Sequence, residues 1–148
     1  MIPDVAITTD MIAGFPGETE AEFEESLAFV REMDFAGGHA FTYSPRPGTA
    51  AARLPDQIPD AVRSQRTRHY LEVFSEAAGR YRQPLVGRTK PVLWESVVPR
   101  QTGDWELAGL TDNYVRVKAV SRRPRWNEVS NVRIAGIAGS FLQGIIIN

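Results

Sequence analysis

The chain has 148 residues and a formal net charge of −1, and its 43% hydrophobic and 24% charged content is typical of a folded globular protein. No run approaches the roughly 18 consecutive apolar residues that a membrane-spanning helix needs, so we expect a cytoplasmic protein. The absence of cysteine excludes disulfides, thiolate nucleophiles and cysteine-ligated iron–sulfur clusters within this chain.

The charge is distributed unevenly along the chain. Residues 1–82 hold eight arginines and thirteen acidic residues, whereas residues 83–148 hold nine basic and five acidic residues. The hydrophobic period changes at the same place, so we expect two parts with a boundary after Arg82. The basic second part suggests an anionic partner, although a solvated surface produces the same bias.

The first part begins with the pattern of a β-α-β unit. Residues 5–13 are mostly apolar, as in a strand that is covered on both faces of a parallel sheet. Thr19 and Glu22 form a capping box, and apolar residues follow at helical spacing, which predicts a helix over residues 19–33. The aromatic-rich run 39–44 predicts the second strand.

A second helix and then an all-β pattern complete the chain. Pro59 stands where proline is favoured in the first turn of a helix, and this helix is expected to run to about Arg82. After Pro84 the sequence contains five short β-like runs: RTKPVLWESVV, WELAGLT, NYVRVKAV, NEVSNVRIAG and SFLQGIIIN. Such spacing predicts a small five-stranded β-barrel, so the fold class is α/β followed by all-β.

One of these runs indicates a two-sided strand. In NYVRVKAV the apolar residues at positions 115, 117 and 119 alternate with the polar ones. This pattern predicts one face in the core and one cationic face, which would carry Tyr114, Arg116 and Lys118.

The turn at residues 14–18, GFPGE, is the first candidate site. It follows a parallel-type strand, and α/β folds place their ligands at the carboxyl ends of such strands. Its glycines allow close approach of a ligand to the backbone. It lacks the lysine of a phosphate-binding loop and the third glycine of the dinucleotide fingerprint, so the pattern alone is equally compatible with a structural turn.

Three longer strings carry a resemblance to a known family. They are TTDMIAGFPGETEAEFEESLAFV, YSPRPGTAAARLPDQIPDAV and LVGRT. Together they resemble the carboxyl-terminal part of the radical S-adenosylmethionine methylthiotransferases, and the resemblance covers nearly the whole chain. It implies that residues 1–82 are the last units of a radical S-adenosylmethionine (β/α) barrel. It further implies that residues 83–148 are the small five-stranded RNA-binding barrel called the TRAM domain.

The resemblance also implies site residues. Backbone groups around Ile12 and Gly14 would contact the adenine of S-adenosylmethionine, while Gly17 and Glu18 would shape the turn. The string SPRPGT at residues 44–49 is similar to the tRNA-modifying branches, which implies a tRNA anticodon loop as partner, although Arg46 alone is compatible with a solvated loop cation. The residues expected to bind RNA are Arg46, Tyr114, Arg116, Lys118, Arg122, Arg123 and Arg125.

Two branches of the family are compatible with the chain. His39 and the string GLTDNYVRV at residues 109–117 look most like the branch that adds a methylthio group to C2 of N6-threonylcarbamoyladenosine at position 37 of tRNA. The isopentenyladenosine branch is the alternative. His39 is equally compatible with a packed, hydrogen-bonded strand histidine.

The chain departs from the family in one large respect. Family members hold 4Fe-4S clusters through cysteines of an amino-terminal part, including a CxxxCxxC motif, and this chain has no cysteine. We therefore expect a fragment, a truncated reading frame or one piece of a split enzyme. It would be inactive without the missing amino-terminal part, and its first 82 residues would not be expected to fold alone. A stand-alone RNA-binding module without catalysis and a nonfunctional remnant are the other interpretations.

Overall fold

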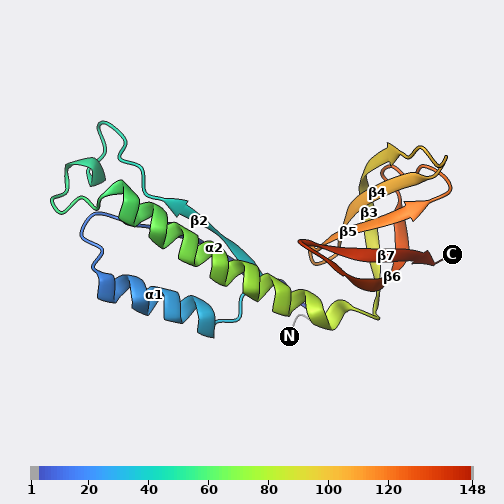
Figure 1. Ribbon diagram of the computed structural model, residues 1–148, viewed down its shortest axis with the longest axis horizontal. Helices are drawn as coiled ribbons and strands as arrows, with labels where there is room; N and C mark the ends of the chain where they lie inside the picture. The colour runs from blue at the N-terminus through green and yellow to red at the C-terminus, as the bar shows by residue number, and fades with distance from the viewer. Residues whose placement is uncertain (1–3, 148) are drawn as a thin grey trace. The chain divides into compact units, whose positions relative to one another are not determined.

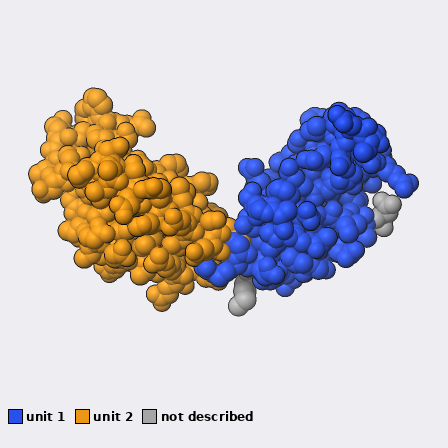
Figure 2. Space-filling model, in the orientation of Figure 1, with its two compact units in different colours: residues 1–6, 79–148 blue, residues 7–78 orange. Residues whose placement is uncertain are grey.

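A computed structural model describes residues 4–147 of the chain (Figure 1). These residues form two compact units, which Figure 2 shows in different colours. The first unit consists of residues 7–78, and the second consists of residues 4–6 together with residues 79–147. No helix within the described range is both long and apolar enough to cross a membrane.

The first unit is built on a parallel β-α-β arrangement. Its elements are β1 (Thr8–Ala13), α1 (Glu20–Glu32), β2 (Gly37–Thr42), the 3-10 helix η1 (Ala51–Arg53) and the part of α2 (Asp60–Arg82) up to residue 78. The two strands pair in parallel, from Thr8 opposite Gly37 to Ala13 opposite Thr42. The predicted order of strand, helix, strand and second helix is therefore confirmed.

Helix α1 begins where its capping box predicts. The Glu22 amide donates a hydrogen bond to the Thr19 hydroxyl at 3.2 Å, and the Thr19 amide donates to the Glu22 carboxylate at 2.8 Å. Two N–H groups that a helix start leaves unpaired are thereby satisfied. Phe23, Leu27 and Val30 are buried, as their helical spacing predicts.

The core of the first unit lies on one face of its two-stranded sheet. Side chains of both helices pack there with the strands, and the buried set is Ala13, Phe23, Leu27, Val30, Phe35, Tyr70, Val73 and Phe74. On the other face, Ile12 and Phe41 are 58% and 53% exposed. The prediction that the first strand is covered on both faces is therefore wrong for residues 4–147, because no element of that range packs against this second face.

The second unit is a closed barrel of five strands. They are β3 (Thr89–Pro99), β4 (Trp105–Thr111), β5 (Arg116–Ser121), β6 (Val129–Ala138) and β7 (Phe141–Ile147), preceded by the 3-10 helix η2 (Gln83–Leu85). The strands close in the order β3-β4-β5-β7-β6, and all neighbours are antiparallel except β5 and β7. The predicted all-β barrel is confirmed.

The barrel encloses a core that is centred on Trp94. This side chain is fully buried, and its indole N–H donates to the Ser130 hydroxyl at 3.0 Å. In β5, Val117 and Ala119 are buried and Arg116 is exposed. The predicted alternation between a core face and a solvent face is therefore confirmed.

Candidate functional site

The turn after β1 depends on two glycines in the left-handed region. Gly14 has φ +76° and Gly17 has φ +86°. A Cβ atom at Gly14 would also overlap the side chain of Arg63 from α2. The Gly14 amide donates a hydrogen bond to the Glu18 carboxylate at 2.8 Å, so this amide is already used within the turn.

Glu18 links the turn to the second helix. Its carboxylate accepts a hydrogen bond from the Arg66 guanidinium at 2.6 Å, and its backbone carbonyl accepts another at 2.9 Å. The other terminal nitrogen of the Arg66 guanidinium donates a hydrogen bond to the Glu20 carboxylate at 2.7 Å. Burial of Arg66 opposes its charge, but the hydrogen bonds to Glu20 and Glu18 outweigh burial and raise the pKa of the guanidinium. The turn is therefore held rigidly by charged groups.

Arg66 is a residue that sequence reasoning missed. It is only 6% exposed and stands first in the buried stripe of α2, whose other members are Thr67, Tyr70, Val73, Phe74 and Ala77. An arginine at the head of an apolar helical stripe is the signal that could have identified it, since buried arginines need carboxylate partners.

A hollow of about 440 Å³ lies beyond the carboxyl ends of β1 and β2. Ile12 and Phe41, which are opposite one another in the sheet, form part of its wall together with Phe15, Tyr43 and Arg46. The structure thus brings the predicted cofactor residue Ile12 and the predicted RNA residue Arg46 to one site. Gly14, Gly17 and Glu18 do not line this hollow but hold the turn next to it.

A tight loop presents Arg46 to this hollow. The Thr49 hydroxyl donates to the Arg46 carbonyl at 2.8 Å, and Gly48 adopts φ +86°. The Arg46 guanidinium has no hydrogen-bond or ion-pair partner within residues 4–147, so it is available to an anion. These contacts account for Gly48 and Thr49 in the loop.

The hollow fits a nucleoside better than it fits a metal. Its exposed apolar side chains, Ile12 and Phe41, can contact the faces of a base, and the buried Tyr43 hydroxyl has no hydrogen-bond partner in the described chain. The nucleoside part of S-adenosylmethionine fits such a wall. A 4Fe-4S cluster does not, since the chain has no cysteine and the part of the chain that the structure describes holds no group of three His, Asp or Glu side chains that could bind a metal.

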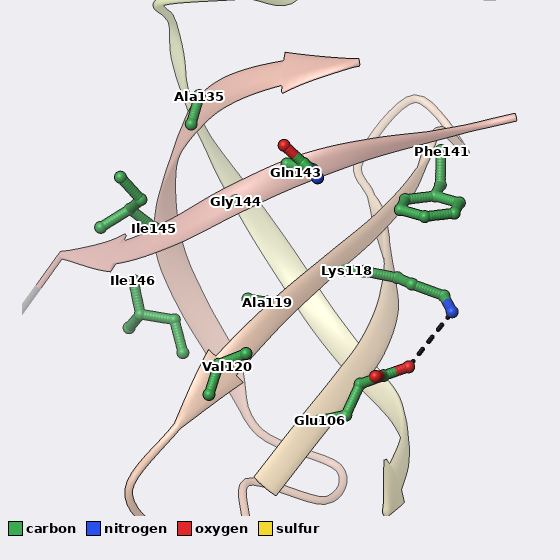
Figure 3. A pocket seen from close by; sticks show the side chains of 10 residues that line it. All are labelled: Glu106, Lys118, Ala119, Val120, Ala135, Phe141, Gln143, Gly144, Ile145 and Ile146. Atoms are coloured by element: carbon green, nitrogen blue, oxygen red, sulfur yellow. Dashed lines mark hydrogen bonds and ion pairs between the residues drawn. The ribbon is translucent and has the colours of Figure 1, made fainter. Parts of the chain in front are cut away.

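The outer face of the barrel is the second candidate site. Lys118 of β5 lies 4.8 Å above the centroid of the Phe141 ring of β7, and its ammonium group is 3.1 Å from the Glu106 carboxylate of β4 (Figure 3). Arg116, the next outward-facing residue of β5, is exposed and has no ion-pair partner in the described range. The predicted pair Arg116 and Lys118 therefore shares one surface.

The predicted RNA residues of the β5–β6 loop differ in their availability. Arg123 donates two hydrogen bonds to the Glu128 carboxylate, at 2.7 Å and 2.8 Å, and these bonds lower the pKa of Glu128. Arg125 lies within 3.3 Å of the Ser121 hydroxyl, and its side chain is only 18% exposed. Both side chains thus stabilise the loop itself. Arg122 is exposed and has no such partner among residues 4–147.

Two exposed aromatic residues lie near opposite ends of β5. Tyr114, in the turn before the strand, is 82% exposed and adopts φ +60°. Trp126, in the loop after it, is 70% exposed and was not singled out from the sequence. The seven predicted RNA residues therefore occupy separate places: Arg46 in the first unit, and the others at the outer face and both ends of β5.

No family model matches the chain, but curated proteins that share one name are similar to it. The chain is 43% identical over 111 residues to the tRNA-2-methylthio-N(6)-dimethylallyladenosine synthase of Burkholderia cenocepacia, a match that covers 75% of this chain and 24% of that protein. The protein of the same name from Burkholderia thailandensis is 41% identical over 111 residues, which again cover 75% of this chain and 24% of that protein. That of Aliarcobacter butzleri is 36% identical over 149 residues, covering 100% of this chain and 33% of that protein.

These matches make the chain a relative of the tRNA methylthiotransferases. The chain spans between about a quarter and a third of the length of the curated relatives that it matches. The five-stranded barrel is consistent with a TRAM domain.

Proposed function

We propose that the chain forms part of a tRNA methylthiotransferase, to which it supplies one wall of the S-adenosylmethionine site and an RNA-binding barrel. The observation that carries the proposal is the nucleoside-sized hollow beside β1 and β2 in a chain that is 43% identical to such a synthase. The complete enzyme would add a methylthio group to C2 of a modified adenosine at position 37 of tRNA.

The modified adenosine is proposed to be N6-isopentenyladenosine. The relatives carry the dimethylallyladenosine name, and dimethylallyl is the same group as isopentenyl. This alternative replaces the threonylcarbamoyl branch, which the strings around His39 and residues 109–117 favoured. His39 is hydrogen-bonded to Asp10 at 3.1 Å on the exposed face of the sheet, so it does not distinguish the nucleosides.

Several residues of the string GLTDNYVRV are required by the local structure of the barrel. A Cβ atom at Gly109 would overlap the Leu93 carbonyl oxygen on β3. The Thr111 hydroxyl donates to the Asn113 side chain at 2.6 Å and accepts from the Val115 amide at 2.9 Å. These contacts are internal to the barrel, so Gly109, Thr111 and Asn113 do not favour either nucleoside.

The residues of this chain would bind and orient rather than carry out the radical chemistry. Ile12 and Phe41 would flank the adenine, and Arg46 would contact an anionic group next to it. One 4Fe-4S cluster, held by cysteines outside this chain, would supply the electron for cleavage of S-adenosylmethionine. The exposed sheet face that holds Ile12 and Phe41 would be covered by that same missing part.

Joining the chain to the missing part tests the proposal directly. The part of the Aliarcobacter butzleri relative that precedes its match would be fused to this chain, and methylthiolation of two tRNAs would be followed by mass spectrometry. We expect modification of tRNA that carries isopentenyladenosine and not of tRNA that carries threonylcarbamoyladenosine. The opposite preference would refute the proposal that the substrate nucleoside is isopentenyladenosine. A well-folded fusion that modifies neither tRNA would refute the proposal that the chain is part of a methylthiotransferase.

Variants of the same fusion test the hollow. Ile12→Asp and Phe41→Asp should each lower the affinity for S-adenosylmethionine at least about tenfold, because a carboxylate would replace an apolar contact to the base. Leu71→Asp is the control, since Leu71 is 48% exposed on α2 and does not line the hollow. If all three variants and the parent bind S-adenosylmethionine with equal affinity, the hollow is not part of the cofactor site.

A stand-alone RNA-binding module is the second candidate function. It is favoured by the closure of the barrel within the described residues and by the exposure of Tyr114, Arg116 and Arg122 on it. Both candidates predict tRNA binding that weakens with salt. Only the first predicts S-adenosylmethionine binding by the fusion.

A further inference from the structure

The parallel contact between β5 and β7 is the shortest in the barrel. These strands pair only at Val117 with Leu142 and at Lys118 with Gln143, whereas the antiparallel neighbours share between five and seven pairs. Beyond these positions a hollow of about 610 Å³ opens between β5 and β7 (Figure 3). We call this hollow the seam pocket. Its size lies within the range of about 300–1,000 Å³ that is usual for small-ligand sites.

Gly144 lines the seam pocket, and its α-carbon faces the buried side chains of the barrel core. A Cβ atom there would overlap the side chains of Val132 and Val117, so the position admits only glycine without repacking. Ala119 also lines the pocket, and the side chain of Val120 forms part of the wall. These apolar side chains can contact the face of a planar base.

Polar and aromatic groups gather at one end of the seam pocket. Figure 3 shows Phe141 and Lys118 at this end, with Glu106 paired to Lys118, and Gln143 farther along β7. The Gln143 side chain is exposed, and its amide can both donate and accept hydrogen bonds. Lys118 and Phe141 also line a second hollow, of about 510 Å³, that Arg116 borders. The outer face therefore offers a ring for stacking, an amide for a base edge and cations for phosphates.

We propose that the seam pocket binds one unpaired nucleobase of single-stranded RNA. The base would stack against Phe141, its edge would meet the Gln143 amide, and the adjoining phosphates would lie by Lys118 and Arg116. This inference rests on the RNA-binding part of the proposed function and goes beyond it by naming the subsite.

The chemistry of the seam pocket favours RNA over an added peptide strand. A peptide strand would need a long run of free backbone groups, whereas β5 continues for only three residues after Lys118. The Lys118–Glu106 ion pair is 43% and 48% exposed, so it is weak and leaves the ammonium group able to reach a phosphate.

The test uses the whole chain and a short single-stranded RNA that contains one 2-aminopurine. The fluorescence of this base falls when it stacks on an aromatic ring, so it reports occupancy of the seam pocket directly. Phe141→Leu, which keeps the apolar volume, should weaken binding about tenfold and abolish the fluorescence change. Phe141→Tyr should restore both, and Phe29→Leu, on α1 of the other unit, should behave as the parent.

Salt dependence separates stacking from charge. Phe141→Leu should leave the slope of affinity against salt unchanged, because it removes no phosphate contact. Lys118→Gln should reduce that slope by the amount expected for the loss of about one phosphate contact. Far-UV circular dichroism and thermal unfolding would establish that each variant is folded.

The outcomes distinguish this inference from the function on which it rests. If the parent binds RNA but Phe141→Leu matches it in affinity and fluorescence, the seam pocket is not the base site and the proposed function stands. If the parent binds RNA with no fluorescence change at any 2-aminopurine position, no base stacks in the seam pocket, and this inference is refuted while the proposed function stands. If the parent binds no RNA, the RNA-binding part of the proposed function fails together with this inference.

Discussion

At the scale of single residues, one carboxylate organises the turn beside the proposed cofactor wall. Glu18 accepts hydrogen bonds from the Gly14 amide and from Arg66, and Arg66 in turn lies 5.1 Å from the centroid of the Phe23 ring. The left-handed turn, the buried cation and the core of the first unit are thereby coupled. Loss of one partner would leave the others buried and unpaired.

Replacing Arg66 should therefore be costly. Arg66→Ala is expected to lower the free energy of unfolding of the first unit by about 3 kcal/mol, because it leaves the Glu18 carboxylate uncompensated. Urea unfolding followed by far-UV circular dichroism measures this change. The control is Arg68→Ala, which removes an exposed arginine from the same helix and should cost less than about 0.5 kcal/mol. Equal effects of the two substitutions would show that the Glu18–Arg66 pair does not stabilise the unit.

Two glycines of the barrel offer a matched comparison. A Cβ atom at Gly109 would overlap the Leu93 carbonyl and approach the Trp94 backbone, whereas at Gly136 its nearest neighbour would be the Gln143 side chain at 3.9 Å. Gly109→Ala should destabilise the barrel by about 2 kcal/mol, and Gly136→Ala should change its stability little. Tryptophan fluorescence during urea unfolding measures both. Similar stabilities would contradict the close packing of β3 against β4.

At the scale of elements, α1 shows how far local sequence determines structure. Its capping box, its apolar spacing and its boundaries are all encoded within fifteen or so residues, so the sequence predicted them correctly. The five strands of the barrel were predicted for the same reason. The short parallel contact between β5 and β7 was not predicted, because strand pairing depends on closure of the barrel rather than on either strand's sequence.

The candidate site was less predictable than the elements that carry it. Ile12 and Arg46 were singled out separately, and only the fold brings them to one hollow. Arg123 forms an ion pair with Glu128 within a loop. A count of charged residues treats Arg123 as an available cation because it does not show this contact. The sequence thus identified the charged residues, but it could not show which of them form ion pairs within the fold and which remain available to a ligand.

The capping box also predicts a pH dependence. The Thr19 amide hydrogen bond lowers the pKa of Glu22 below its ordinary value of 4.5, so its contribution is fully present above that pH and is lost as the pH falls through the lowered value. Glu22→Gln should therefore be less stable than the parent at pH 7 and nearly equal to it at about pH 2. Thermal unfolding by circular dichroism at both pH values measures this difference. Glu24→Gln, an exposed neighbour on α1, should follow the parent throughout, and an equal effect there would point to general charge repulsion.

At the scale of the whole molecule, the chain passes between its two units twice. Residues 4–6 belong with the barrel, where Asp4 lies 3.0 Å from the guanidinium of Arg88 and accepts a hydrogen bond from the Tyr81 hydroxyl at 2.7 Å. The chain then forms the first unit and returns to the barrel at Gly79. We expect limited proteolysis to leave a resistant fragment that begins between Gly79 and Gln83. Equal protection of residues 7–78 would contradict that expectation.

The two units should also unfold separately, and the chain carries a separate probe for each. The three tryptophans, Trp94, Trp105 and Trp126, all lie in the barrel, whereas α1 and most of α2 lie in the first unit. Tryptophan fluorescence therefore reports the barrel, and the helical circular dichroism signal reports the first unit. The first unit has a two-stranded sheet with one uncovered face, so its transition should come at lower urea.

Core substitutions decide whether these transitions are independent. Leu27→Ala, in α1, should move only the circular dichroism transition, and Leu107→Ala, in the barrel core, should move only the fluorescence transition, because each removes about 2–5 kcal/mol from its own unit. If both signals instead change together in every variant, the chain unfolds as one cooperative body. The expectation that the first unit unfolds separately at lower urea would then be wrong.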